Sequence, residues 1–140
     1  MSTDGSQRFA GKVAFVTGAG SGIGRAAALA FAQEGAHVAV VDRDEQATAV
    51  TVEQIEQLGG TALAVACDVT SSEQVKAAVD SAVARFGHLD IAFNNAGVEL
   101  RPTPIADISE ADFDRIVDTN LRGVFLCMKH QIPHMLQHGS

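Results

Sequence analysis

Residues 13–24 read VAFVTGAGSGIG, an apolar run that leads directly into a glycine-rich loop. The apolar run is typical of a buried strand. From Gly22 to Glu34, apolar residues recur at a spacing of three to four, which predicts a helix. The glycines therefore lie in a turn between a strand and a helix, which is the context of a phosphate-binding loop.

Each glycine of this loop has a physical reason to be there. Gly18 and Gly22 let the backbone turn sharply and approach a ligand, and Gly24 removes the side chain where the helix packs on the strand. The N–H groups and partial positive charge of a helix N-terminus favour a pyrophosphate at this point. The spacing G-x-x-x-G-x-G differs from the common dinucleotide fingerprint G-x-G-x-x-G. Taken alone, the loop is therefore also compatible with a plain strand-to-helix turn.

The rest of the chain repeats the strand-then-helix alternation. Strands are expected at 12–17, 37–42, 61–66 and 89–93. Helices are expected at 22–34, 45–58, 72–86 and from about 109 or 110 toward 135, with a kink or break near Pro133. Helix ends are marked by an N-cap and by glycine stops, namely Ser71, Gly35, Gly59, Gly60 and Gly87. This order predicts an α/β fold, a Rossmann-type doubly wound parallel sheet.

Length and composition limit the possible classes of protein. The 140 residues are 46% hydrophobic and 19% charged, as in soluble globular proteins, with a formal net charge of −7. The scattered basic residues argue against nucleic acid or an anionic membrane as a partner. No apolar stretch approaches the roughly 18 residues that span a bilayer. We expect a flexible tail over 1–8 without signal-peptide features and one domain over 9–140. Two distant cysteines, Cys67 and Cys127, suit a reducing cytoplasm.

An acidic residue ends the second expected strand and bears on the choice of cofactor. Asp42 lies eighteen residues after Gly24, where a carboxylate can bind the hydroxyl groups of a ribose. The same carboxylate repels a 2′-phosphate, so the sequence favours NAD over NADP. Arg43 beside it could weaken that preference. An ordinary solvated strand end is the alternative interpretation of Asp42.

Two further motifs follow the third and fourth expected strands, CDV at 67–69 and NNAG at 94–97. Ligands of open parallel sheets bind beyond the carboxyl ends of the strands, where both motifs lie. Together with TGAGSGIG at 17–24 and Asp42, they resemble the short-chain dehydrogenase/reductase family over roughly 8–138. The resemblance implies hydride transfer between a nicotinamide dinucleotide and a small alcohol or carbonyl substrate.

The resemblance also implies roles for individual residues. Around Gly18–Gly24 it implies backbone contacts to the cofactor phosphates, with Ser21 and Ile23 closest, and it places the adenosine ribose at Asp42. The remaining implied contacts are the adenine amino group at Asp68, the underside of the adenine ring at Val69, and the ribose region at Asn95, Ala96 and Gly97. Asn94 is interpreted as a residue that braces the strand.

The resemblance is incomplete at the catalytic residues. Asn120 matches the family's helix asparagine, which orders a proton-relay water. The family's catalytic Ser and its Tyr-x-x-x-Lys are absent from this chain, which contains no tyrosine. We therefore expect the sheet strands 3-2-1-4 of a larger enzyme, truncated before its catalytic region and inactive alone. A non-catalytic dinucleotide-binding or interaction module is the alternative.

Histidines recur every four residues near the end of the last expected helix, at His130, His134 and His138. One helical face could present them to a metal, but Pro133 is expected to disturb the spacing and no Cys or carboxylate completes the set. We therefore expect no metal site, and keep a metal-binding helix end as the alternative. The family resemblance also implies that this helix pairs with its twin in a homo-oligomer.

Overall fold

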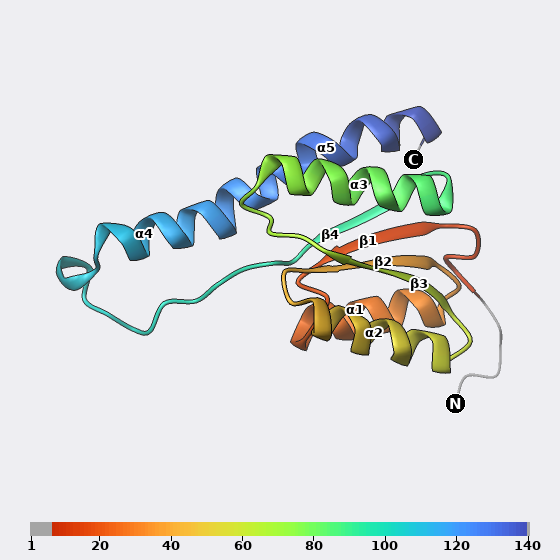
Figure 1. The fold of residues 1–140 in the computed structure, drawn as a ribbon, viewed down its shortest axis with the longest axis horizontal. Helices are drawn as coiled ribbons and strands as arrows, with labels where there is room; N and C mark the ends of the chain where they lie inside the picture. Colours follow the sequence, from red (N-terminus) through yellow and green to blue (C-terminus); the bar gives the residue numbers. More distant parts are fainter. Residues whose placement is uncertain (1–6, 140) are drawn as a thin grey trace.

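The computed structural model describes residues 7–139, so most of the expected tail over 1–8 lies outside the described residues. Figure 1 shows one layer of strands between two layers of helices. The strands are β1 (Val13–Thr17), β2 (His37–Asp42), β3 (Thr61–Ala66) and β4 (Ile91–Asn94). The helices are α1 (Gly22–Gln33), α2 (Glu45–Gln57), α3 (Ser72–Phe86), α4 (Glu110–Val117) and α5 (Gly123–His138). A short 3₁₀ helix (Ile105–Asp107) precedes α4, and a π-helical turn (Asp118–Arg122) joins α4 to α5.

The four strands form one parallel sheet in the order β3-β2-β1-β4, which confirms the expected Rossmann-type topology. In the registers, Ala14 of β1 pairs with Val38 of β2 on one side and with Ile91 of β4 on the other. The chain adds β2 and β3 on one side of β1 and then β4 on the other side, so the strand order reverses between β1 and β4. Ligands of such sheets bind at this reversal, beyond the carboxyl ends of the strands.

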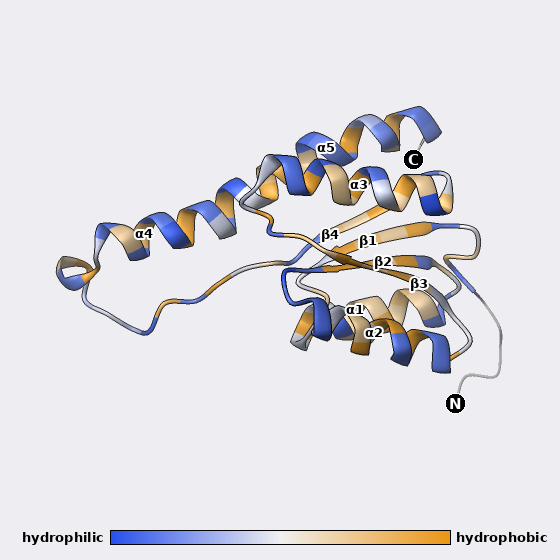
Figure 2. Cartoon of the chain, viewed as in Figure 1, coloured by the Kyte–Doolittle hydropathy of each residue, from blue (hydrophilic) through white to orange (hydrophobic). Residues whose placement is uncertain are grey.

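Alternate residues of the strands point into two cores, one on each face of the sheet. Val13 and Phe15 of β1 pack with α3 and α5, whereas Ala14 and Val16 pack with α1 and α2. All four side chains are at most 1% exposed. Figure 2 shows the strands as the most hydrophobic layer of the molecule, as expected of a parallel sheet covered on both faces.

The predicted boundaries of the first three helices agree closely with the structure. Ser71 caps α3 by accepting a hydrogen bond from the Gln74 N–H group. Gly35, Gly59 and Gly87 all follow helices with φ between 82° and 94°, a region that glycine adopts readily. Of the helices described, none is both long and apolar enough to cross a membrane.

Two predicted boundaries were wrong. The fourth strand begins at Ile91 rather than Leu89, because the Asp90 carboxylate bonds the Val13 N–H group and turns the chain into the sheet. The last helix is not broken at Pro133, since α5 continues to His138. Proline at 133 removes one bond to the Lys129 carbonyl, and both residues are exposed, so water can take that bond. The irregular turn lies further upstream, in the π-helical segment.

The chain between β4 and α5 leaves the sheet. A long connection, which includes the 3₁₀ helix, carries the chain outward, and α4 then leads back toward α5 as one extended helical arm (Figure 1). Large apolar side chains remain exposed along this arm, namely Ile105, Phe113, Leu121, Phe125, Met128, Ile132 and Leu136. The buried face of α5 packs against α3 and β4 through Leu126 and Cys127.

Candidate functional site

A cleft of about 700 Å³ lies at the carboxyl ends of the strands, at the reversal of strand order. Most residues predicted to bind a cofactor line it: Gly18, Ser21, Gly22, Ile23, Asp42, Arg43, Asp68, Val69, Asn95, Ala96 and Gly97. Asn120, the predicted catalytic residue, lines it too. Gly24 does not. The cleft also includes residues for which the sequence predicted no role in binding, namely Val41, Cys67, Val98, Glu99 and Thr119.

The glycine loop is held from below by side chains of α1 and α2. Thr51 of α2 donates its hydroxyl to the Ala19 carbonyl at 2.9 Å and is completely buried. Arg25 of α1 donates to the Gly20 carbonyl and to the Thr51 hydroxyl. These bonds tie two consecutive carbonyl groups of the loop to side chains of α1 and α2.

The N-terminus of α1 opens onto the cleft. Ser21 is the N-cap residue, yet its hydroxyl makes no capping bond within the described chain. The first N–H groups of a helix have no partner inside the helix, and here they belong to Gly22, Ile23 and Gly24. A Cβ atom added to Gly22 would meet nothing within 4 Å, since this position faces the open cleft. The turn is therefore free to receive an anionic group.

Gly24 serves packing rather than the cleft surface. A Cβ atom at this position would overlap the Gly18 carbonyl oxygen and lie 2.6 Å from the Gly18 carbonyl carbon. The first turn of α1 therefore rests directly on the backbone of the strand-to-helix loop. The structure agrees with the packing role that the sequence analysis gave to Gly24.

Asp42 links the glycine loop to the end of β2. One carboxylate oxygen accepts the Gly20 N–H group at 3.0 Å, and the other accepts the Asp44 N–H group at 3.0 Å. The carboxylate is thereby oriented at the rim of the cleft, and each oxygen keeps a lone pair for a further donor. Arg43, which also lines the cleft, follows directly.

The loop after β3 contributes Asp68 and Val69. The Asp68 carboxylate accepts both the N–H group and the hydroxyl of Thr70, at 2.9 and 2.8 Å, and the Gln74 side chain accepts the Asp68 N–H group. Val69 is 7% exposed and packs against Gly123, where an added Cβ atom would lie 2.8 Å from a Val69 methyl group. The start of α5 thus supports this side of the cleft.

The segment after β4 is held against β1 by Thr17, for which the sequence predicted no role. The buried Thr17 hydroxyl accepts the Ala96 N–H group at 3.0 Å, and the Asn95 side chain donates to the Thr17 carbonyl at 3.3 Å. The sequence signal that could have predicted this role is the position of Thr17 at the end of β1, immediately before the glycines. Thr17 joins the two strand ends that form the floor of the cleft.

Asn120 and Asn94 both act as braces. The Asn120 amide oxygen accepts the Val98 N–H group at 2.8 Å, and its amide nitrogen donates to the Val98 carbonyl at 2.9 Å. Asn94 exchanges two similar bonds with Gln131 of α5, at 3.0 and 2.8 Å. Two side-chain amides therefore attach the β4 strand end and the following loop to the long helical arm.

Neither cysteine offers a nucleophile at this site. Burial raises the pKa of the Cys67 thiol to about 11, and the neighbouring Asp68 charge acts in the same direction. Burial likewise raises the pKa of the Cys127 thiol to about 12, with Cys67 contributing. Since the thiolate is the reactive form, both thiols remain protonated and unreactive near neutral pH.

Comparison with known proteins identifies relatives over almost the whole chain. Residues 12–140 match the family described as short chain dehydrogenase. Cyclohexanol dehydrogenase of Acinetobacter sp. (strain SE19) is 42% identical over 135 residues, which cover 96% of this chain and 54% of that protein. The chain thus spans about half the length of the curated relatives that it matches.

Solved structures show the same similarity in three dimensions. A hydroxysteroid dehydrogenase from Escherichia coli superposes with a TM-score of 0.91 at 39% identity, covering 98% of this chain and 57% of that one. A 3-ketoacyl-(acyl-carrier-protein) reductase from Brucella melitensis, complexed with NADH, superposes with a TM-score of 0.89 at 43% identity. That match covers 94% of this chain and 52% of the reductase.

Proposed function

Because this chain belongs to the short-chain dehydrogenase family, we propose that it is the nicotinamide-dinucleotide-binding portion of an alcohol or carbonyl oxidoreductase. One observation carries the proposal. The open N-terminus of α1 and the oriented carboxylate of Asp42 border one cleft at the reversal of strand order. An anion-binding turn beside a hydroxyl-binding carboxylate matches the pyrophosphate and ribose of a dinucleotide.

The remaining lining residues support a defined orientation of the cofactor. The first turn of α1, with Ser21, Gly22 and Ile23, would hold the phosphates, and Asp42 would accept hydrogen bonds from the adenosine ribose. Asp68 and Val69 would bind the adenine. The segment 95–97 would contact the second ribose, and Asn120 remains our candidate for the proton relay. When bound, the nicotinamide accepts or supplies the hydride.

We further propose that the cofactor is NAD rather than NADP. The Asp42 carboxylate is at the cleft rim, where a 2′-phosphate would meet a negative charge, and the Brucella relative is a complex with NADH. Among the described residues that line the cleft, Arg43 is the one cation, and it could partly offset that charge. The alcohol or carbonyl substrate would be handled by the whole protein, and the cytoplasmic location remains a prediction.

Calorimetric titration of the 140-residue protein with NADH tests the proposal directly, because the chain has no Trp or Tyr to report binding by fluorescence. We expect saturable binding of one NADH per chain and weaker binding of NADPH. The absence of binding to a chain shown by circular dichroism to be folded would overturn the proposed function.

Replacing Asp42 by alanine should weaken NADH binding by about tenfold or more, because the ribose loses a charged acceptor. The variant also loses the bond to the Gly20 N–H group, which affects both cofactors, but NADPH gains from removal of the repulsive charge, so the gap between the two affinities narrows. Calorimetry on both cofactors measures the effect.

Asp44→Ala provides the matched control for Asp42→Ala. Asp44 is an exposed carboxylate two residues away, and its side chain caps α2 by accepting the Ala47 N–H group. Its loss should cost about 1 kcal/mol of folding free energy and leave the cofactor preference unchanged. An unchanged preference in Asp42→Ala as well would remove Asp42 from the ribose site.

The exposed apolar side chains of α4 and α5 support a homo-oligomer, in which two copies of the arm cover each other. Phe125 is 57% exposed and Leu136 is 72% exposed, on the same arm. Burial of such side chains favours association. We expect Phe125→Glu to shift the protein toward monomer in analytical ultracentrifugation. A monomeric unmodified chain, or no shift in the variant, would contradict this assignment.

A further inference from the structure

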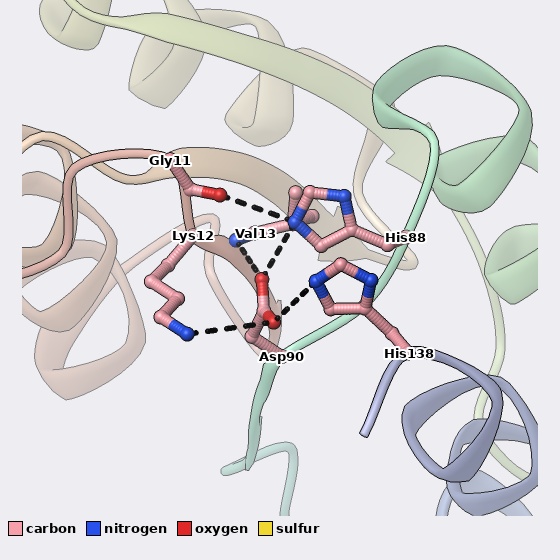
Figure 3. A network of polar contacts seen from close by, with 6 residues as sticks. All are labelled: Gly11, Lys12, Val13, His88, Asp90 and His138. Carbon is pink, nitrogen blue, oxygen red and sulfur yellow. Dashed lines mark hydrogen bonds and ion pairs between the residues drawn. The ribbon is translucent and has the colours of Figure 1, made fainter. Parts of the chain in front are cut away.

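A cluster of two histidines and an aspartate lies where the residues just before β1, the start of β4 and the end of α5 meet (Figure 3). The Nε2 atom of His88 lies 2.9 Å from Oδ2 of Asp90, and the Nε2 atom of His138 lies 3.5 Å from its Oδ1. The two imidazole rings stack with centroids 4.0 Å apart. Each ring thus places its Nε2 atom against one oxygen of the Asp90 carboxylate.

This cluster lies at the amino ends of β1 and β4, at the opposite end of the strands from the cofactor cleft. Asp90 directly precedes β4 and bonds the Val13 N–H group at the beginning of β1, whereas the cleft follows the ends of those strands. The three residues come from two parts of the fold: His88 and Asp90 lie in the connection between α3 and β4, and His138 belongs to the last turn of α5. Whatever binds here would join the end of α5 to the sheet, away from the proposed chemistry.

We propose that His88, Asp90 and His138 bind a divalent transition metal ion of the Zn²⁺ type, as a structural clip. Their ligand atoms lie within 4.8 Å of one another, and among residues 7–139 this is the only group of three such side chains so close together. Two imidazole nitrogens and one carboxylate are a known set of protein ligands for zinc and leave a fourth tetrahedral position for a water.

The distances suit such an ion once the His138 ring turns out of its stack on His88, because a metal ion lies in the plane of each imidazole ring that binds it. Zinc bonds to nitrogen and oxygen are about 2.0–2.2 Å long, which places tetrahedral ligand atoms on the order of 3.4 Å apart. The distance from His88 Nε2 to Asp90 Oδ2, 2.9 Å, and that from His138 Nε2 to Asp90 Oδ1, 3.5 Å, lie on either side of that value. The His138 side chain is 46% exposed at a helix end and can adjust. The Asp90 side chain is 3% exposed and keeps its orientation through the Val13 N–H group.

Two neighbouring groups must give way when an ion binds. His88 Nε2 donates a hydrogen bond to the Gly11 carbonyl oxygen at 3.1 Å, and an ion at that nitrogen would replace this bond. The Lys12 ammonium group lies 4.0 Å from Asp90 Oδ1 and opposes a cation. Because the Lys12 side chain is half exposed, it can turn into solvent when an ion binds. Lys12→Met should therefore bind the metal a few-fold more tightly.

The proposal departs from the expectation of no metal site and also from the alternative of three histidines on one helix face. In the structure His130 bonds Ser72 at 3.0 Å, His134 pairs with Asp80 at 3.5 Å, and only His138 reaches Asp90. Helical spacing had suggested the wrong companions for His138, since its partners come from a segment about 50 residues earlier.

Calorimetric titration of the chelator-treated chain with ZnCl₂ tests this site. We expect one Zn²⁺ per chain, and a rise in melting temperature with Zn²⁺ but not with Mg²⁺, an ion that prefers oxygen ligands. His88→Asn and His138→Asn should each weaken Zn²⁺ binding by at least about tenfold. Loss of a residue that only supports a metal ligand typically weakens binding by about 10- to 100-fold, and loss of a ligand itself should cost no less. Cobalt substitution should give the visible absorption of a tetrahedral ion.

His130→Asn is the matched control, because it changes the same residue type on the same helix outside the cluster. It should bind Zn²⁺ as the unmodified chain does. Failure of the folded chain to bind one Zn²⁺ would overturn the proposal. Equal weakening in His130→Asn and His138→Asn would also overturn it, since binding would then depend on histidines in general. NADH binding is measured separately, and its presence or absence does not affect this test.

Discussion

A Gly24→Ala variant is expected to lose about 3 kcal/mol of folding free energy and all measurable NADH binding. The added methyl group would overlap the Gly18 carbonyl oxygen. The obstacle is backbone, which cannot rotate away as a flexible side chain can, so the effect belongs at the upper end of the usual range for overpacking. The helix must shift away from the loop, and the first-turn N–H groups shift with it. Urea unfolding and calorimetry with NADH measure the two effects.

Gly59→Ala is the control for this experiment. It makes the same chemical change after α2, where an added Cβ atom meets nothing within 4 Å and φ is +82°. Its cost should be the strain of a left-handed residue alone, about 1 kcal/mol, with NADH binding unchanged. If Gly24→Ala were no less stable than Gly59→Ala, the close packing of α1 on the loop would not be a feature of the folded protein.

A Gly22→Val variant should remain folded and bind NADH at least about 100-fold more weakly. Position 22 opens into the cleft, so the valine side chain would occupy the space that we assign to the pyrophosphate. A loss of this size corresponds to about 2.7 kcal/mol of binding free energy. It would separate the binding role of Gly22 from the packing role of Gly24. Calorimetry with NADH, after circular dichroism shows an intact fold, provides the measurement.

Backbone strain must be distinguished from obstruction in this second variant, because φ at Gly22 is +53° and a β-branched residue is disfavoured there. Gly59→Val places the same side chain at another position of positive φ, far from the cleft, and reports strain alone. Normal NADH affinity in a folded Gly22→Val variant would contradict the assignment of the phosphate site to this loop.

The sequence predicted the sheet well because its signals are local. Each strand is a short apolar run, and glycines such as Gly35 and Gly87 end the helices through their own backbone conformation. The cleft could also be predicted, since a parallel sheet brings the carboxyl ends of all its strands to the same side of the molecule. The sequence therefore predicts that Asp42 and Asn95 lie close together.

The features that the sequence did not reveal depend on pairs of distant residues. Asn94 and Gln131 are 37 positions apart, and Asp90 and Val13 are 77 apart. No periodicity links the members of such a pair, so their contacts emerge only from the packed fold. Exposure also decided the outcome at Pro133, since a helix tolerates a missing bond where water can replace it. The sequence shows the proline but not its surroundings.

The π-helical turn at Asp118–Arg122 sets the rotational phase of everything after it. An α-helix advances by about 100° and 1.5 Å per residue, so one residue more or less in this turn would rotate α5 by more than a quarter of a circle. Gln131 would then miss Asn94, and His138 would miss Asp90. A substitution that spares Asn120 keeps this phase, whereas a single-codon insertion or deletion would misalign both of these contacts of α5 at once. Natural variation must therefore preserve the length of this segment.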